Sequence, residues 1–163
     1  MKKIVSLILV LSFVLSLVSC QWFDNITDKS TINGVNLSKY SIVYSEDDYD
    51  YAKRAAEYIQ SKIIERTSLV LPLVEDSEEP ATEYEIVVGN TNRDISKTLD
   101  ADTKGLEFAI LAEEKQIALE ADYFIIAAAA YFFIETYVPT SGYDAIVPQV
   151  LSIHTPIVKE ANN

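Results

Sequence analysis

The segment from Gly89 to Arg93, Gly-Asn-Thr-Asn-Arg, carries the side chains best suited to hold a ligand. A phosphate-binding loop would have a second glycine, or a Gly-Lys-Ser/Thr ending in front of a helix, and this segment has neither. A single glycine there is typical of a backbone position with positive φ, and Asn and Thr side chains commonly bond nearby amides. The pattern therefore favours the end of a strand. We retain Asn90, Asn92 and Arg93 as candidates for binding a sugar or a carboxylate.

Two acidic segments raise the possibility of a cation site. The acidic residues at 46–50 are explained without a metal, because Asp47 or Asp48 can cap the helix that follows, and we favour this interpretation. Residues 100–105 resemble the start of a calcium-binding EF-hand loop, but Lys104 and Leu111 stand where calcium needs oxygen ligands. We therefore expect neither a metal site nor a cofactor.

Catalytic residues are not indicated by any motif. The chain has one histidine, His154, which lies near the C-terminus outside any Ser-His-acid pattern, and one histidine with one cysteine cannot form a zinc site. Acidic residues are plentiful, but none stands in a local context typical of the paired carboxylates of glycoside hydrolases. We expect a protein without enzymatic activity.

The N-terminus predicts export. Residues 1–19 have two lysines followed by an apolar run that is too short to span a bilayer, which is typical of a secretory signal peptide. Leu17 to Cys20, Leu-Val-Ser-Cys, resembles a bacterial lipobox, in which the cysteine is lipidated and becomes the new N-terminus. The alternative is an ordinary signal peptide with an unrelated cysteine near its end. The prediction is a lipoprotein anchored through Cys20 and exposed outside the cytoplasm.

Charge restricts the partners. The formal net charge is −12, and removal of residues 1–19, with two lysines and no acids, makes it −14. Nucleic acid is disfavoured as a partner because binding to phosphates needs clustered Lys and Arg. Attraction to anionic lipid is disfavoured as well, so membrane attachment would depend on the two acyl chains on Cys20.

Secondary-structure patterns predict one domain between a tether and a tail. We assign residues 20–38 to a polar tether, 39–148 to the domain and 149–163 to the tail. Runs rich in β-branched and aromatic residues predict strands, and apolar residues at helical spacing predict a helix whose buried face is Ala52, Ala55, Ala56, Ile59 and Ile63. Strands are expected at 40–45, 69–74, 84–88 and 143–147, a hairpin within 105–122, and helices at 46–68 and 123–134.

The second predicted helix is apolar throughout, and twelve residues are too few to cross a bilayer, so we expect it to be buried in the core. The order of elements indicates an α/β fold of the α+β type. It would have a mixed β-sheet of about five to six strands with two helices packed on one face.

Four segments together resemble a known module. They are INGVNLSKYSIVYS from residue 32, DYAKRAAEYIQSKIIERTSLVLPLVED from residue 50, YEIVVGNTNR from residue 84, and AAAAYFFIETYV from residue 127 with a following IVP. In order and spacing the chain, over about residues 32–148, resembles the non-catalytic α/β accessory domain of glycoside hydrolases. Such domains are found as the second domain of β-N-acetylhexosaminidases and the N-terminal domain of α-glucuronidases.

The resemblance implies a fold more strongly than a function. In those enzymes the catalytic acids lie on a barrel for which this chain has no room, so no catalytic residue is carried over. The segment YVPTSGYD also lacks the Arg-aromatic pair that usually leads into the barrel. We expect a non-catalytic domain that assists glycan capture or docks onto a carbohydrate-active protein. The alternative is a structural or protein-interaction lipoprotein without glycan affinity, derived from a longer enzyme.

Overall fold

The computed structural model describes residues 30–46, 50–99, 107–113, 115–138, 144–145 and 150–154. The predicted signal peptide, Cys20 and the EF-hand-like segment at 100–105 lie outside these residues, as do Asp47 and Asp48. No helix within the described part of the chain has both the length and the apolar character needed to cross a membrane.

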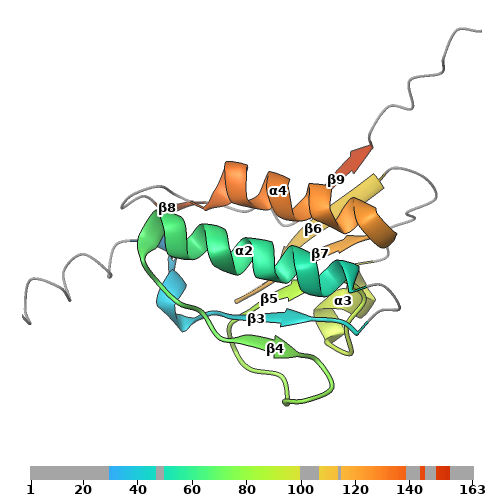
Figure 1. The fold of residues 1–163 in the computed structure, drawn as a ribbon, viewed down its shortest axis with the longest axis horizontal. Helices are drawn as coiled ribbons and strands as arrows, with labels where there is room; N and C mark the ends of the chain where they lie inside the picture. The colour runs from blue at the N-terminus through green and yellow to red at the C-terminus, as the bar shows by residue number, and fades with distance from the viewer. Residues whose placement is uncertain are drawn as a thin grey trace, which may run out of the picture.

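The main layer is a six-stranded mixed sheet, shown in Figure 1. Its order is β4-β3-β5-β7-β6-β9, with bounds β3 Ser41–Tyr44, β4 Leu73–Glu75, β5 Glu85–Val88, β6 Glu107–Glu113, β7 Gln116–Ala121 and β9 Val150–His154. The first four strands in this order are parallel, and β6 and β9 continue the sheet in antiparallel pairing. The predicted hairpin is confirmed, with Glu113 opposite Gln116. The predicted α/β class and mixed sheet are therefore confirmed.

Two helices, α2 (Tyr51–Thr67) and α4 (Ile126–Tyr137), pack side by side on one face of the sheet. The buried residues of α2 are the five predicted from spacing. A third, short helix, α3 (Asp94–Thr98), was not predicted, and its Ile95 packs with Val87 and Ala118 in a separate cluster on the opposite face. The alternation of strand side chains explains the two clusters, because Ile86 and Val88 face α2 and α4 while Val87 faces α3.

Helix α4 differs from the expectation of burial on every side. Ala129, Ala130 and Phe133 are fully buried against the sheet, whereas Tyr131 is 59% exposed. The short 3-10 helix η2 (Tyr123–Ile125) in front of it also exposes Tyr123 and Phe124. The prediction of burial on every side is wrong, because an apolar sequence does not reveal that the helix packs on the sheet with one face and leaves the other face open.

The expected tether and tail both contribute strands. Residues 30–38 form β1 (Thr31–Ile32), β2 (Val35–Asn36) and the start of the 3-10 helix η1 (Leu37–Lys39). They bury Ile32 and Leu37 completely in the main core, so the domain begins earlier than predicted. The predicted strand at 143–147 is β8 (Asp144–Ala145), which pairs with β1 in a small second sheet, and the predicted tail supplies β9.

Arg66 joins the two long helices at their C-terminal ends. Its guanidinium donates to the backbone oxygens of Ile134 and Val138, the latter at 2.9 Å, and pairs with the carboxylate of Glu135. The Ile134 oxygen also accepts from the backbone amide of Val138, so the arginine adds a second donor at the end of α4, where carbonyls commonly lack partners within the helix. The contact fixes α4 against α2 and so places the residues at their opposite ends.

Candidate functional site

The parallel strands β3 and β5 lie side by side, and the connections that follow them cross opposite faces of the sheet. From β3 it passes through α2 on one face to β4, and from β5 it passes through α3 on the other face toward β6 and β7. A crevice forms at the carboxyl ends of strands at such a switch point, where α/β proteins commonly bind ligands. A pocket of about 420 Å³ occurs there, which we call the switch-point pocket.

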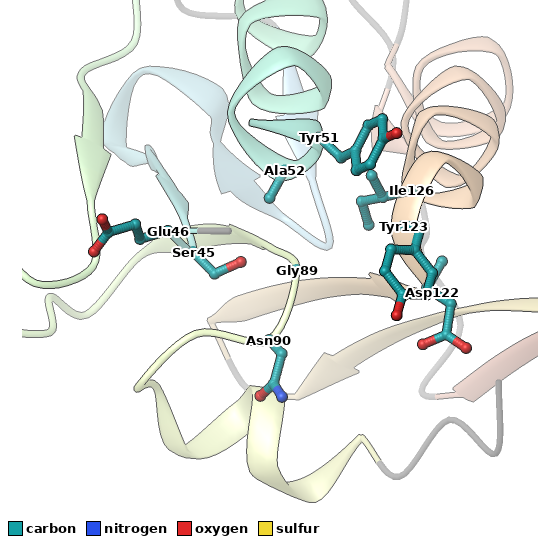
Figure 2. A pocket seen from close by; sticks show the side chains of 10 residues that line it. Ser45, Glu46, Tyr51, Ala52, Gly89, Asn90, Asp122, Tyr123 and Ile126 are labelled. Atoms are coloured by element: carbon teal, nitrogen blue, oxygen red, sulfur yellow. The ribbon is translucent and has the colours of Figure 1, made fainter. Parts of the chain in front are cut away.

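Polar groups of the switch-point pocket come from three strand ends, as Figure 2 shows. Ser45 and Glu46 follow β3, Asn90 follows β5, and Asp122 follows β7. Asp122 is the N-cap residue of η2, but its side chain makes no capping hydrogen bond. Carboxylate, amide and hydroxyl groups therefore surround one opening.

Ser45 is the most enclosed polar residue of this pocket. It is 7% exposed, its backbone amide donates to Val88, and its hydroxyl is directed toward Gly89 and the pocket. Among the described residues, no hydrogen-bond partner of this hydroxyl is found. A hydroxyl that opens into a pocket and has no protein partner is available to a ligand.

Gly89 is needed to keep the pocket open. Its φ is +81°, as the sequence predicted for the single glycine, and its amide donates to the backbone oxygen of Leu119 at 2.8 Å. A Cβ at this position would lie 2.5 Å from Ser45 Oγ and 3.0 Å from Ala52 Cβ. Any larger residue would therefore strain the backbone and crowd the serine hydroxyl.

Two tyrosines complete the lining. Tyr51 begins α2, and Tyr123 begins η2, where it is 69% exposed and has a positive φ of 43°. None of the described lining residues is cationic, and Glu46 and Asp122 are both acidic. The arrangement can donate and accept hydrogen bonds beside aromatic rings, and it disfavours anionic ligands because no positive group would balance them.

The structure separates the three predicted ligand residues. Asn90 lies in the switch-point pocket, but Arg93 is 4% exposed and bonds to the protein itself. Its Nε lies 3.0 Å from Glu85 Oε2, and its terminal nitrogens donate to the backbone oxygens of Asp76 and Glu79. Arg93 therefore fastens the 75–85 loop to the sheet, and its binding of a sugar or a carboxylate stays a prediction.

Asn92 belongs to the same network. Its backbone amide donates to Asp76 Oδ2 at 2.6 Å, its side-chain amide donates to Asp76 O at 2.7 Å, and its Oδ1 accepts from Arg93. Thr91 Oγ1 pairs with Ser96 Oγ at 2.8 Å. The interpretation of this segment as a strand ending with local side-chain bonds is thus correct from Thr91 onward, and Asn90 alone turns to the pocket.

Sequence reasoning missed Ser45, Asp122 and Tyr123 as site residues. The available signal was positional, because Ser45 and Asp122 are the last residues of a predicted strand and of the predicted hairpin, and the carboxyl ends of parallel strands share one edge. Within the described residues, no group of three or more His, Cys, Asp or Glu side chains could hold a metal ion.

Comparison with known proteins gives a distant likeness in structure. No protein-family model matches this chain, and no curated protein matches it in sequence. Among solved structures it is similar to a GH138 enzyme targeting pectin rhamnogalacturonan II, with a TM-score of 0.42 and 15% sequence identity. The match covers 59% of this chain and 10% of that enzyme, so the chain spans a small part of the enzyme's length. Function does not transfer over such a distance.

Proposed function

We propose that this chain is a lipid-anchored, non-catalytic domain outside the cytoplasm that captures glycans in the switch-point pocket. In this role it would act alone or together with a carbohydrate-active partner protein. The anchor is the predicted lipid on Cys20, and the glycan is a partner suggested by the segments that resemble glycoside hydrolase accessory domains.

The observation that carries this proposal is the hydroxyl of Ser45, a residue that is 7% exposed. It faces the pocket without a hydrogen-bond partner among the described residues, and Asn90 and Asp122 line the same pocket. Sugar hydroxyls both donate and accept, so they can bond to all three kinds of group at once. A ligand with several adjacent hydroxyls suits this set better than an apolar one.

Aromatic rings and charge narrow the class of glycan. Tyr123 is exposed at the rim and Tyr51 lies on the opposite helix, so a sugar ring could pack its apolar face on a phenol ring. Glu46 and Asp122 would repel uronic acids and sulfated or phosphorylated sugars. The glycan is therefore a neutral one.

Catalysis is not part of the proposal, for a structural reason. The general acid of a glycoside hydrolase is typically a carboxyl group held in an apolar, desolvated setting. Glu46 and Asp122 are both exposed to solvent. Two solvated carboxylates can bind hydroxyls, but they lack that setting.

Binding can be tested on the full-length chain reconstituted in phospholipid nanodiscs. Neutral and acidic oligosaccharides are titrated and followed by ligand-observed NMR, with empty nanodiscs as a blank. We expect saturable binding of a neutral glycan, weakened about fivefold or more by Asn90→Ala, since one hydrogen bond contributes on the order of 1 kcal/mol. Asn92→Ala is the matched control and should keep the affinity, because Asn92 bonds within the protein.

Two results would contradict the proposal. If no neutral glycan binds saturably, the pocket is not a glycan site, and the alternative of a protein-interaction lipoprotein gains support. If the purified chain hydrolyses aryl glycosides and Asp122→Asn abolishes that activity, the protein is an enzyme.

A further inference from the structure

An apolar groove lies between α2 and α4 on the outer side of the helix layer. It has a volume of about 440 Å³, and its lining includes Tyr58 from α2, Phe124 from η2, and Ala127 and Tyr131 from α4. Phe124 and Tyr131 are 61% and 59% exposed. Arg54 is the one charged side chain among the described residues that line it. Aromatic side chains gathered at an open groove indicate contact with an apolar group.

The groove adjoins the switch-point pocket. Tyr51 and Ile126 line both hollows, and the neighbouring residues Tyr123 and Phe124 line one each. Figure 2 shows Tyr51 and Ile126 between the two helices, above the polar groups of the pocket. A single ligand can therefore place a polar end among Ser45 and Asn90 and an apolar end along α4.

We propose that the ligand is a glycoside with an apolar aglycone, in which the sugar occupies the switch-point pocket and the aglycone occupies the groove. This inference rests on the proposed glycan binding and specifies its ligand. An unsubstituted glycan that continued into the groove would lose hydrogen bonds to water and find few polar partners there. An alkyl or aryl group would instead be removed from water against Tyr58 and Tyr131.

A second copy of the chain is the main competitor for the groove, and charge opposes it. Each chain has a formal net charge of −12, or −14 after removal of residues 1–19, so two copies repel each other. The groove itself offers one cation, Arg54, to offset this. A dimer would also leave the adjoining polar pocket without a role, whereas an amphiphilic ligand would occupy both hollows.

The test compares methyl and phenyl β-glucosides and β-galactosides, which differ in the aglycone alone. The full-length chain in nanodiscs is titrated with each, and empty nanodiscs correct for partition of the phenyl compounds into lipid. We expect the phenyl glycoside of the bound sugar to bind about tenfold more tightly than the methyl glycoside, since even partial burial of an aryl group gives a gain of this order.

Two matched variants locate this gain. Ala127→Glu places a carboxylate in the groove, and Ala128→Glu places the same charge on the next exposed residue of α4, outside the groove. Ala127→Glu should abolish the advantage of the phenyl compound and leave methyl glycoside affinity unchanged. Ala128→Glu should leave both affinities unchanged.

The outcomes separate this inference from the function on which it rests. If methyl glycosides bind but phenyl glycosides bind no more tightly, or if the gain survives Ala127→Glu, the aglycone does not lie in the groove and the inference is wrong. If neither methyl glycoside binds, glycan capture itself fails for these sugars and the inference fails with it. Self-association in sedimentation velocity that Ala127→Glu abolishes would assign the groove to a second copy, and would overturn the inference.

Discussion

Arg93 and Glu85 form an ion pair that is almost completely enclosed. The Nε of Arg93 lies 3.0 Å from Oε2 of Glu85, and the two side chains are 4% and 1% exposed. The remaining Glu85 oxygen accepts from the backbone amide of Thr82 at 2.7 Å. The pair therefore joins the segment after β5 to the first residue of that strand. Each charge depends on the other, because either one would be buried without a counter-charge if its partner were removed.

Removal of one partner should be costly. We expect Arg93→Ala to lower the free energy of unfolding by about 3 to 5 kcal/mol, because it leaves Glu85 buried without its counter-charge. The double variant Glu85→Ala with Arg93→Ala should lose less than the sum of the single variants. Urea denaturation of all three measures this. Lys97→Ala is the control, since its pair with Asp94 is exposed and should contribute no more than about 1 kcal/mol. Equal losses for Lys97→Ala and Arg93→Ala would contradict the assignment.

Gly89 should tolerate substitution less well than Gly34. Both have positive φ, +81° and +74°, but a Cβ at Gly34 would meet no atom within 4 Å, whereas one at Gly89 would meet Ser45 Oγ at 2.5 Å. Gly34→Ala therefore measures backbone strain alone, about 1 kcal/mol. Gly89→Ala should cost at least about 1 kcal/mol more in thermal or urea unfolding, because a buried contact must also shift. Similar losses in the free energy of unfolding for Gly34→Ala and Gly89→Ala would show that Ser45 can move aside without cost.

Tyr40 should make the fold sensitive to alkaline pH. Burial, and to a smaller extent the neighbouring Tyr84, raise the pKa of Tyr40 to about 12 from an ordinary value of 10.0. A phenol whose pKa is raised in the folded state stabilises the fold below pH 10, and this contribution is lost as pH rises from about 10 to about 12, where the unfolded chain ionises first. The loss is on the order of 2 to 3 kcal/mol.

The pH prediction is checked by urea unfolding between pH 8 and 11.5, with tyrosinate absorbance followed in parallel. In Tyr40→Phe the free energy of unfolding should fall less steeply with pH than in the parent chain. Some decline should remain, because burial also raises the pKa of Tyr44 and of Tyr137. Tyr131→Phe, at an exposed position, should show the same dependence of the free energy of unfolding on pH as the parent chain. An identical decline in Tyr40→Phe and the parent would show that Tyr40 is not its source.

Cys20 should anchor the protein. In a bacterial host, Cys20→Ala is expected to leave an uncleaved precursor or to release the protein from the membrane fraction, because a diacylated cysteine supplies the two chains needed for stable attachment. Membrane fractionation with mass spectrometry of the N-terminus measures both outcomes. Normal cleavage and unchanged membrane association in the variant would mean that another feature anchors the chain.

Local patterns in the sequence were sufficient for much of the fold. The spacing of Ala52, Ala55, Ala56, Ile59 and Ile63 identified the buried face of α2, because a helix repeats every 3.6 residues whatever covers it. The single glycine after β5 indicated a positive φ for the same local reason. Ile32 and Leu37 were missed because two-residue strands have no periodicity to recognise.

The candidate site was decided by tertiary structure. Ser45, Asn90 and Asp122 are far apart in sequence, and they meet because β3, β5 and β7 are parallel and end at the same edge. Asn90 and Arg93 are three residues apart, yet one faces the pocket and the other is buried against Glu85. The sequence by itself determined the longer elements, such as α2, β3, β5 and the β6-β7 hairpin, because their patterns depend on neighbours along the chain, but it did not indicate α3 or β9. Which side chains share a pocket depends on strand order and direction, and these follow from contacts between segments that are distant along the chain.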